Sequence, residues 1–276
     1  MKVKQYLVAI FAIGLIAVIY RFGVTKFPAA PLVQKDAPTT SITSLLSNAR
    51  PQLPAPQRKF EEDLQNQLAI ARTVPDSITA TEALMRFWGN DMKNHDIASW
   101  YLFQKAKLEN SEKSLTFAAN FILENTIHGD GNTMSATWKA GLAQELFRAA
   151  LQKNPGNDSL TTGLGASYLF GGGNNTMEGV QMILQQLRTD SANAYAHKML
   201  GFGNIRNGET AKAISRFERS VQINPADTSL LPVLAMLCRE AKDTLRAEKW
   251  FRKTKEVLRD NPEFLKSFEA QYNSLR

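Results

Sequence analysis

The chain has 276 residues, 43% of them hydrophobic, which excludes a disordered protein and suffices for one large or two modest domains. The formal net charge of +7 comes from Lys and Arg residues scattered among acids, which favours solvated helix faces over a patch for nucleic acid or anionic lipid. Because Cys238 is the only cysteine, an intrachain disulfide, a thiolate metal cluster and a Cys-x-x-Cys redox motif are excluded.

An uncharged apolar run stands near the N-terminus. Residues 6–20, YLVAIFAIGLIAVIY, follow Lys2 and Lys4, as in a signal sequence or a signal anchor. At about 1.5 Å per residue the run is shorter than the roughly 30 Å hydrocarbon layer, unless residues 22–24 extend it and Arg21 reaches outward. We expect an uncleaved membrane-spanning helix within residues 1–26.

Two other interpretations of this run fit less well. A cleaved signal peptide needs small residues at its cleavage site, but Ala29 and Ala30 stand between Pro28 and Pro31. A buried core helix is at odds with a place ahead of a proline-rich stretch. Because the leading tail is so short, we expect it on the inner side of the membrane and the rest of the chain outside.

A segment rich in Pro, Ala, Ser and Thr covers residues 27–57. Its prolines block a regular helix, and at about 3.1 Å per residue it would hold a folded domain well away from a bilayer. We therefore expect a linker over 27–57 and a folded domain over 58–276. The prolines are Pro28, Pro31, Pro38, Pro51, Pro54 and Pro56.

A helical repeat fills the rest of the chain, where apolar residues recur at three- and four-residue spacing. A small residue is followed by Phe four residues later, another small residue three further on, and Pro five beyond that. The phenylalanines of two copies lie 70 residues apart, or twice 35, and a third copy starts 34 residues later. The copies are Ala143, Phe147, Ala150 and Pro155; Ala213, Phe217, Ser220 and Pro225; and Ala247 and Phe251. The pairs Leu164–Gly165 and Leu200–Gly201 recur at an offset of 36.

This pattern resembles the tetratricopeptide repeat, whose signature recurs about every 34 residues. The resemblance implies an all-α fold, a right-handed superhelical solenoid of helical hairpins, as in single-span membrane-anchored bacterial proteins of this family. It divides the domain into units at about 79–110, 111–157, 158–193, 194–227 and 228–262, followed by a capping helix at 263–275. We expect residues 58–72 to add a helix that covers the first unit.

Small and bulky residues set the spacing of these helices. We expect Gly165, Gly201 and Ala213 to lie at close contacts between helices. In the unit from residue 111, Phe117–Ala118 and Phe121 match the Leu-Gly and Tyr positions of the family signature. The residues expected to fill the space between successive hairpins are Phe147, Phe217 and Phe251.

Two stretches interrupt the repeat. Residues 171–175, GGGNN, could cradle a phosphate, but no strand precedes them and no Gly-Lys-Ser/Thr follows, so they predict a turn between two helices. Residues 128–139, HGDGNTMSATWK, delay the next repeat position and predict a loop or a lengthened helix on one face.

No set of residues has the spacing of a catalytic or metal site. His95, His128 and His197 are far apart and none belongs to a metal-ligand pattern. We expect no enzymatic activity, cofactor or metal, and an enzyme with an unrecognised site remains the alternative. Cys238 is most simply a small core residue.

The resemblance also implies where a partner binds, because the first helices of such hairpins line a concave groove. In the unit from 111 the implied lining is Glu112, Leu115, Ala119, Ile122 and Leu123. In the later units the implied partner-binding residues are Thr162, Leu169, Tyr195, Lys198, Phe202, Ile205, Arg206, Met236 and Arg239.

This lining is largely apolar with a few basic residues, which suits a peptide that has apolar anchors and some negative charge. Packing of Tyr195, Phe202 and Met236 against a neighbouring repeat stays open. The expected function is a membrane-tethered scaffold that binds other proteins of the bacterial cell envelope, from the outer side of the cytoplasmic membrane. The alternative is a basic surface for anionic lipid or nucleic acid, although we expect no nucleic-acid partner.

Overall fold

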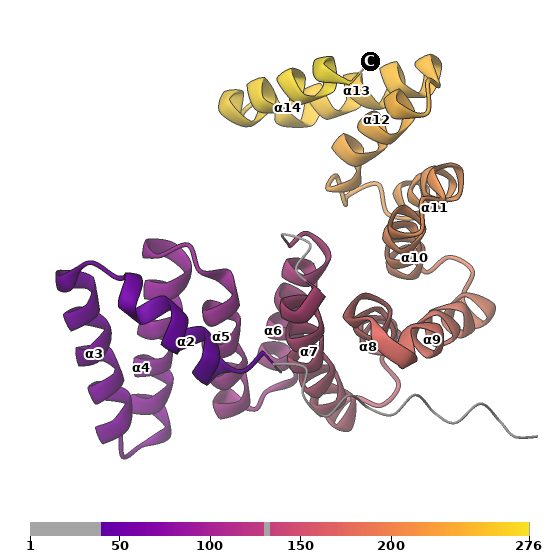
Figure 1. Cartoon of the computed structure of the whole chain (residues 1–276). Helices are drawn as coiled ribbons and strands as arrows, with labels where there is room; N and C mark the ends of the chain where they lie inside the picture. The colour runs from indigo at the N-terminus through magenta and orange to yellow at the C-terminus, as the bar shows by residue number, and fades with distance from the viewer. Residues whose placement is uncertain (1–39, 130–132, 276) are drawn as a thin grey trace, which may run out of the picture. The chain divides into compact units, whose positions relative to one another are not determined.

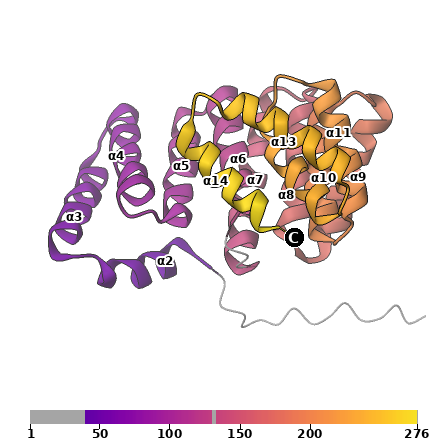
Figure 2. The same ribbon diagram turned by 90° about the horizontal axis from the view of Figure 1, so that it is seen from above.

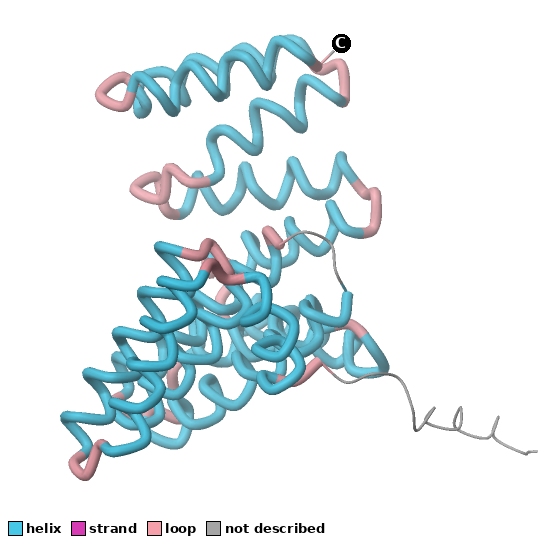
Figure 3. The backbone as a smooth tube through the Cα atoms, turned by 60° about the vertical axis from the view of Figure 1, so that its left-hand side comes forward, coloured by secondary structure: helices cyan, strands magenta, loops and turns pink. Residues whose placement is uncertain are grey.

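The computed structural model describes residues 40–129 and 133–275, and every regular element within these two ranges is a helix (Figures 1 and 3). The all-α expectation is therefore confirmed for the described part of the chain. The expected anchor over 1–26 lies outside the described residues, as do residues 27–39 of the expected linker. Among the helices of the described ranges, none has the length and apolar character needed to cross a membrane.

The described end of the expected linker is helical, which corrects the prediction of an extended stalk up to residue 57. Helix α2 (Ile42–Ala49) begins with a capping box, in which Ser41 and Ser44 exchange side-chain-to-backbone hydrogen bonds. A 3-10 turn, η1 (Arg50–Gln52), and helix α3 (Ala55–Ile70) follow. The prolines do not prevent this, because Pro54 caps α3 and Pro56 lies in its first turn, where no backbone N–H donor is needed.

Helices α2 and α3 cover the first helical pair. Ile42, Leu45 and Leu46 pack onto an apolar cluster that includes Leu64 and Trp88. Helix α2 also lies against α5 (Figures 1 and 2). The N-terminal part of the described chain therefore belongs to the same folded unit as the repeats.

Five consecutive helical pairs follow, and each helix packs on the next in chain order (Figures 1 and 3). One further helix, α14 (Pro262–Ser274), packs on α12 and α13. The first pair has a π-helical turn, η2 (Phe87–Asp91), and the third has a 3-10 turn, η3 (Gly173–Asn175). The pairs are α4 (Val74–Arg86) with α5 (His95–Glu109), α6 (Glu112–Ile127) with α7 (Thr133–Lys153), α8 (Asp158–Gly171) with α9 (Thr176–Thr189), α10 (Ala194–Arg206) with α11 (Thr210–Ile223), and α12 (Leu230–Glu240) with α13 (Thr244–Leu258).

Glycine and alanine bring the helices of a pair close together. A Cβ atom on Gly165 would lie 3.0 Å from the Gly179 carbonyl oxygen of α9, and one on Gly201 would collide with the Phe217 ring of α11. Ala213 is fully buried. The close inter-helix contacts predicted at Gly165 and Gly201 are therefore confirmed, and Ala213 lies in the core.

The two interrupted stretches have simple structural roles. Gly172 and Gly173 adopt φ angles of 73° and 77°, which side-chain-bearing residues rarely adopt, and they turn the chain from α8 to α9. Of the insertion, residues 133–139 lengthen the N-terminal end of α7. Pro232 lies in the first turn of α12, where no backbone N–H donor is needed.

Candidate functional site

Helix α6 begins one residue later than the repeat register predicts, because that register counts residue 111 as the first helical position. Ser111 is its N-cap, held by a capping box with Ser114, so Glu112 is the first helical residue. The lining implied for this helix is mostly core, because Leu115, Ala119, Ile122 and Leu123 are each at most 1% exposed. The residues that face α10 are Asn120 and Glu124, each one position after an implied lining residue.

Helices α6 and α10 contact each other although the α8–α9 pair separates them in sequence. The Tyr195 hydroxyl donates to the Asn120 side-chain oxygen at 3.0 Å. The rings of His128 and Phe202 meet edge to face with centroids 5.1 Å apart. Desolvation raises the pKa of the Tyr195 phenol above its ordinary value, with a smaller contribution from the nearby Glu124 charge.

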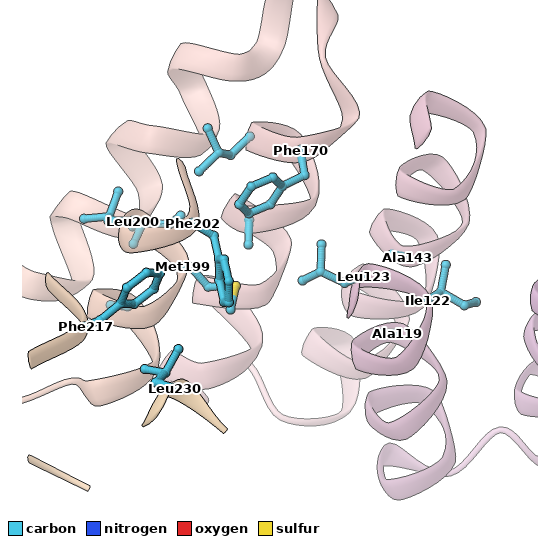
Figure 4. Packing of buried hydrophobic residues seen from close by; sticks show 14 of the residues in the cluster. Ala119, Ile122, Leu123, Ala143, Phe170, Met199, Leu200, Phe202, Phe217 and Leu230 are labelled. Atoms are coloured by element: carbon cyan, nitrogen blue, oxygen red, sulfur yellow. The ribbon is translucent and has the colours of Figure 1, made fainter. Parts of the chain in front are cut away.

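These contacts cover the face of α8 between the two helices. Thr162 is fully buried and Leu169 is 4% exposed, with the Leu169 side chain against Gly203 of α10. Phe202 is 8% exposed and packs on Phe217 in the core (Figure 4). The predicted residues Thr162, Leu169, Tyr195 and Phe202 thus make contacts within the chain, which cover part of the inner face of α8.

Lys198, one of the predicted basic residues, has acidic partners within the chain. Its ammonium group lies 3.5 Å from Asp227 and 3.7 Å from Glu124, and it donates to the Ser229 hydroxyl at 3.1 Å. Burial would raise the pKa of Asp227, but hydrogen bonds from Ser229 and the Lys198 charge hold it below its usual value. The pKa of Glu124 is also lowered, first by the hydrogen bond with His128 and then by Lys198. Lys198 of α10 therefore connects the C-terminal end of α6 with the turn that precedes α12.

The predicted residues Phe202, Ile205 and Arg206 come together at a pocket of about 640 Å³, which we call the glycine-turn pocket. Its other lining residues include His128, Phe170, Gly171 to Gly173 and Val233. Arg206 donates to the carbonyls of Leu169 and Phe170, each at 3.1 Å, where a cation is favourable against the C-terminal end of α8. Its guanidinium group has this local structural role whether or not a ligand enters the pocket.

Of the last two predicted residues, Arg239 contacts the capping helix and Met236 packs against the core. Met236 is half-buried and packs against the main core. The Arg239 guanidinium lies 4.7 Å from the centre of the Tyr272 ring of α14, and its Nε donates to the Leu275 carbonyl at 3.1 Å. Phe251 stacks on Tyr272 with centroids 4.3 Å apart, so this end of the stack is covered, while Phe264 of α14 is 65% exposed.

A second hollow, which the sequence did not reveal, opens between α4 and α6. Helix α6 packs closely on α8, and α8 on α10, whereas α4 makes no comparable contact with α6. The resulting space has a volume of about 480 Å³ and its floor is helix α5. We call it the α4–α6 groove, and its apolar lining residues are Met85, Ala98, Leu102, Ala106, Phe117 and Phe121.

Phe117 and Phe121, which match the Leu and Tyr positions of the repeat signature, form the exposed wall of this groove. They are 62% and 45% exposed, and their rings stack with centroids 6.3 Å apart. The one-residue shift of α6 explains their exposure, because it places Ala118 and Ile122 in the core instead, both fully buried. The sequence signal that could have revealed this wall is the pair of aromatic residues four positions apart, which lie side by side on a helix outside the buried stripe of α6.

The rim of the α4–α6 groove carries paired charges and one free lysine. Lys105 lies 3.0 Å from Glu82 and 3.6 Å from Glu109, and its hydrogen bond is the main cause of the lowered pKa of Glu82. Arg86 pairs with the same Glu82. Lys113 is exposed and forms no ion pair within the described residues.

The described residues hold no group of three or more His, Cys, Asp and Glu side chains that could bind a metal ion. Cys238 is fully buried, and desolvation raises the pKa of its thiol to about 11, which disfavours the reactive thiolate. Cys238 is therefore a core residue, as the sequence predicts.

No protein-family model matches the chain, and no curated protein matches its sequence. Among solved structures, it is similar to residues 41 to the end of MamA from Desulfovibrio magneticus RS-1, with 16% identity, a TM-score of 0.38, and coverage of 68% of this chain and 99% of that chain. A structure of the MamA RS-1 ArsTM double mutant has 16% identity, a TM-score of 0.36, and coverage of 68% and 98%. At this level of similarity neither match shows a shared family or function.

Proposed function

We propose that this protein is a protein-interaction scaffold, and that the α4–α6 groove binds an apolar helical segment of a partner. The single observation that carries the proposal is the stacked pair Phe117 and Phe121, which are 62% and 45% exposed beside a buried apolar floor. Burial of a phenylalanine side chain contributes about 1.5–3 kcal/mol, so covering both rings would supply a large part of a specific binding energy.

The shape of the groove favours a helix as the bound element. Ala98, Leu102 and Ala106 lie four residues apart along α5, so they form one stripe on the floor. This stripe extends over about 12 Å at about 1.5 Å per residue, which corresponds to about two turns of a partner helix. Small residues at both ends of the stripe allow close approach, and Phe117 and Phe121 can pack between the side chains of such a helix.

The middle of the surface between α6 and α10, by contrast, is covered by contacts within the chain, and beside them the glycine-turn pocket stays open. Binding at the covered part would require separation of Tyr195 from Asn120 and of Lys198 from its acidic partners. The α4–α6 groove requires no such rearrangement, because its aromatic wall is already exposed.

Site-specific photocrosslinking in cells tests this assignment. A photoreactive amino acid replaces Phe121 in the full-length chain, and in a matched variant it replaces Phe264, which is 65% exposed on α14. The proposal predicts a discrete crosslinked partner from position 121 that is absent from position 264. The same adducts from both positions, or none from position 121, would contradict it.

We also infer that the scaffold is tethered to a membrane, with the repeats on the outer side of a bacterial cytoplasmic membrane and a role in assembling envelope proteins. The support is the uncharged run at residues 6–20 behind Lys2 and Lys4. Deletion of residues 1–21 should release the protein into the soluble fraction. Unchanged sedimentation of the truncated protein with membranes would refute the tether.

A further inference from the structure

We propose that a basic groove between α9 and α11 binds an acidic segment of a second protein, with Arg216 and Arg219 as the residues that contact its carboxylates. This groove goes beyond the proposed function, because it lies between the second helices of two pairs and selects a different chemistry. A chain with both grooves can bring together two partners, one through an apolar helix and one through an acidic segment.

The α9–α11 groove is a concave surface with a mixed lining and a volume of about 800 Å³. Val180 and Leu184 of α9 form one wall, and Leu200 of α10 contributes to the floor. The opposite wall is α11, with Ser215, Arg216 and Arg219. The groove therefore offers aliphatic surface beside two guanidinium groups.

No carboxylate from the described residues lines this groove, and its two arginines have no acidic partner there. Of the two acids near it in sequence, one neutralises Lys212, the third cation of the lining, and accepts from Asn204, whereas the other contacts α13. Glu209 forms an ion pair with Lys212, and Glu218 accepts a hydrogen bond from Trp250 at 3.2 Å and lies 3.5 Å from Arg246. Neither Arg216 nor Arg219 forms an ion pair within the described residues.

His197 holds the Arg216 side chain in place. The ring Nε2 of His197 donates to the Ser191 carbonyl at 3.2 Å, a tautomer assigned from this contact, so Nδ1 is free to accept from Arg216 Nη1 at 3.2 Å. Burial is the main cause of the lowered pKa of His197, and the nearby Arg216 and Arg219 lower it further. The remaining N–H groups of the Arg216 guanidinium can bind a carboxylate, which arginine often does through two parallel hydrogen bonds.

The lining favours an acidic peptide over a nucleic acid or a bilayer. A nucleic-acid site needs cations that follow several successive phosphates, and a bilayer needs a flat or protruding basic surface. Here two guanidinium groups face an aliphatic wall inside a hollow. A segment that alternates acidic and aliphatic side chains complements both walls at once.

Fluorescence anisotropy with labelled probes tests the assignment on the full-length chain in an uncharged detergent. The probes are a peptide of alternating Glu and Leu, the same peptide with Gln in place of Glu, and oligothymidylate. The variants are Arg219→Glu and, as a matched control, Arg252→Glu, which makes the same charge change at an exposed position on α13 outside the groove. Ser215→Glu is a second groove variant that places a carboxylate on the exposed rim without removing an arginine.

The expected result is that the Glu–Leu peptide binds at least about tenfold more tightly than the Gln–Leu peptide, as expected for a hydrogen-bonded charge pair. Arg219→Glu and Ser215→Glu should each weaken binding by about tenfold or more, whereas Arg252→Glu should not. Circular dichroism establishes that each variant keeps its helices. The proposal would be overturned if the Glu–Leu peptide did not bind, or if both groove variants bound it as tightly as the wild type. It would also be overturned if oligothymidylate bound more tightly than the peptide and Arg219→Glu abolished that binding.

Discussion

The Tyr195 hydroxyl donates a hydrogen bond to the Asn120 side chain at 3.0 Å and so joins α10 to α6 across the intervening pair. Helices α6 and α10 are the first helices of their pairs, and the contact covers α8, which lies between them in sequence. Part of the inner surface is thereby covered, while the glycine-turn pocket at the C-terminal end of α8 stays open.

Removal of the Tyr195 hydroxyl should therefore destabilise the repeats. Tyr195→Phe leaves the Asn120 side chain without its donor, and we expect the free energy of unfolding to fall by about 1–2 kcal/mol in urea denaturation. Tyr168→Phe is the control, because the Tyr168 hydroxyl accepts from Arg148 at an exposed position. A loss no larger than that of the control would show that the α6–α10 contact contributes little.

Substitution of two helical glycines by alanine should have opposite effects. At Gly165 a Cβ atom would crowd the Gly179 carbonyl and Ile183, each at 3.0 Å, so Gly165→Ala should destabilise the protein by about 1–3 kcal/mol. At Gly141 a Cβ atom meets nothing within 4 Å, so Gly141→Ala should stabilise it by about 0.5–1 kcal/mol. Thermal denaturation of both variants measures the difference, and equal shifts would contradict the predicted close packing of α8 on α9.

Neutralisation of one buried acid should loosen the N-terminal helices. Glu61 has no exposed side-chain surface and accepts from Arg50 Nε and Nη2 at 3.0 and 2.8 Å, which ties η1 to α3. Glu61→Gln should lower the free energy of unfolding by about 2–3 kcal/mol, which is less than for a fully buried ion pair because the Arg50 side chain is 40% exposed. The substitution should also speed proteolysis within residues 42–52. Glu62→Gln removes the same charge at an exposed neighbouring position and should leave the cleavage rate unchanged. Equal cleavage of the two variants would refute this role.

Acidification should weaken the fold through His197. Its pKa is below the ordinary value of about 6.5 in the folded protein, mainly because of burial, so the unfolded chain takes up the proton first as the pH falls. The contribution of the neutral ring is therefore present above about pH 6.5 and is lost as the pH falls below it. The unfolding free energy of His197→Gln should depend less on pH between about 7.5 and 5.5 than that of the wild type. Parallel pH profiles for the two proteins would contradict this prediction.

Periodicity in the sequence was enough to predict the helical pairs and the contacts within them. Gly165, Gly201 and Phe217 stand at repeat positions whose spacing directly reflects the packing of one helix on the next. The predicted start of α6 is wrong by one residue, because Ser111 is the N-cap and not the first helical residue. An offset of one residue turns the predicted buried face by about 100° around the helix axis. With this offset Phe117 and Phe121 fall outside the buried face of α6, where they form the aromatic wall of the α4–α6 groove.

The contacts that cover part of the inner surface could not be predicted in the same way. Tyr195 and Asn120 are 75 residues apart, and a repeat frame relates each position only to its equivalents, not to residues two units away. The prolines near residue 50 likewise predict that no regular helix forms there. Pro54 and Pro56 instead lie at the start of α3, where proline is favoured.

The affinity of the crosslinked partner for two matched variants tests the central claim most directly. The variants are Phe117→Ser with Phe121→Ser, which removes the aromatic wall, and Phe264→Ser, which removes an equally exposed phenylalanine elsewhere. The account predicts that the double variant binds at least about tenfold more weakly than the wild type and that Phe264→Ser binds with unchanged affinity. Wild-type affinity in the double variant would contradict it.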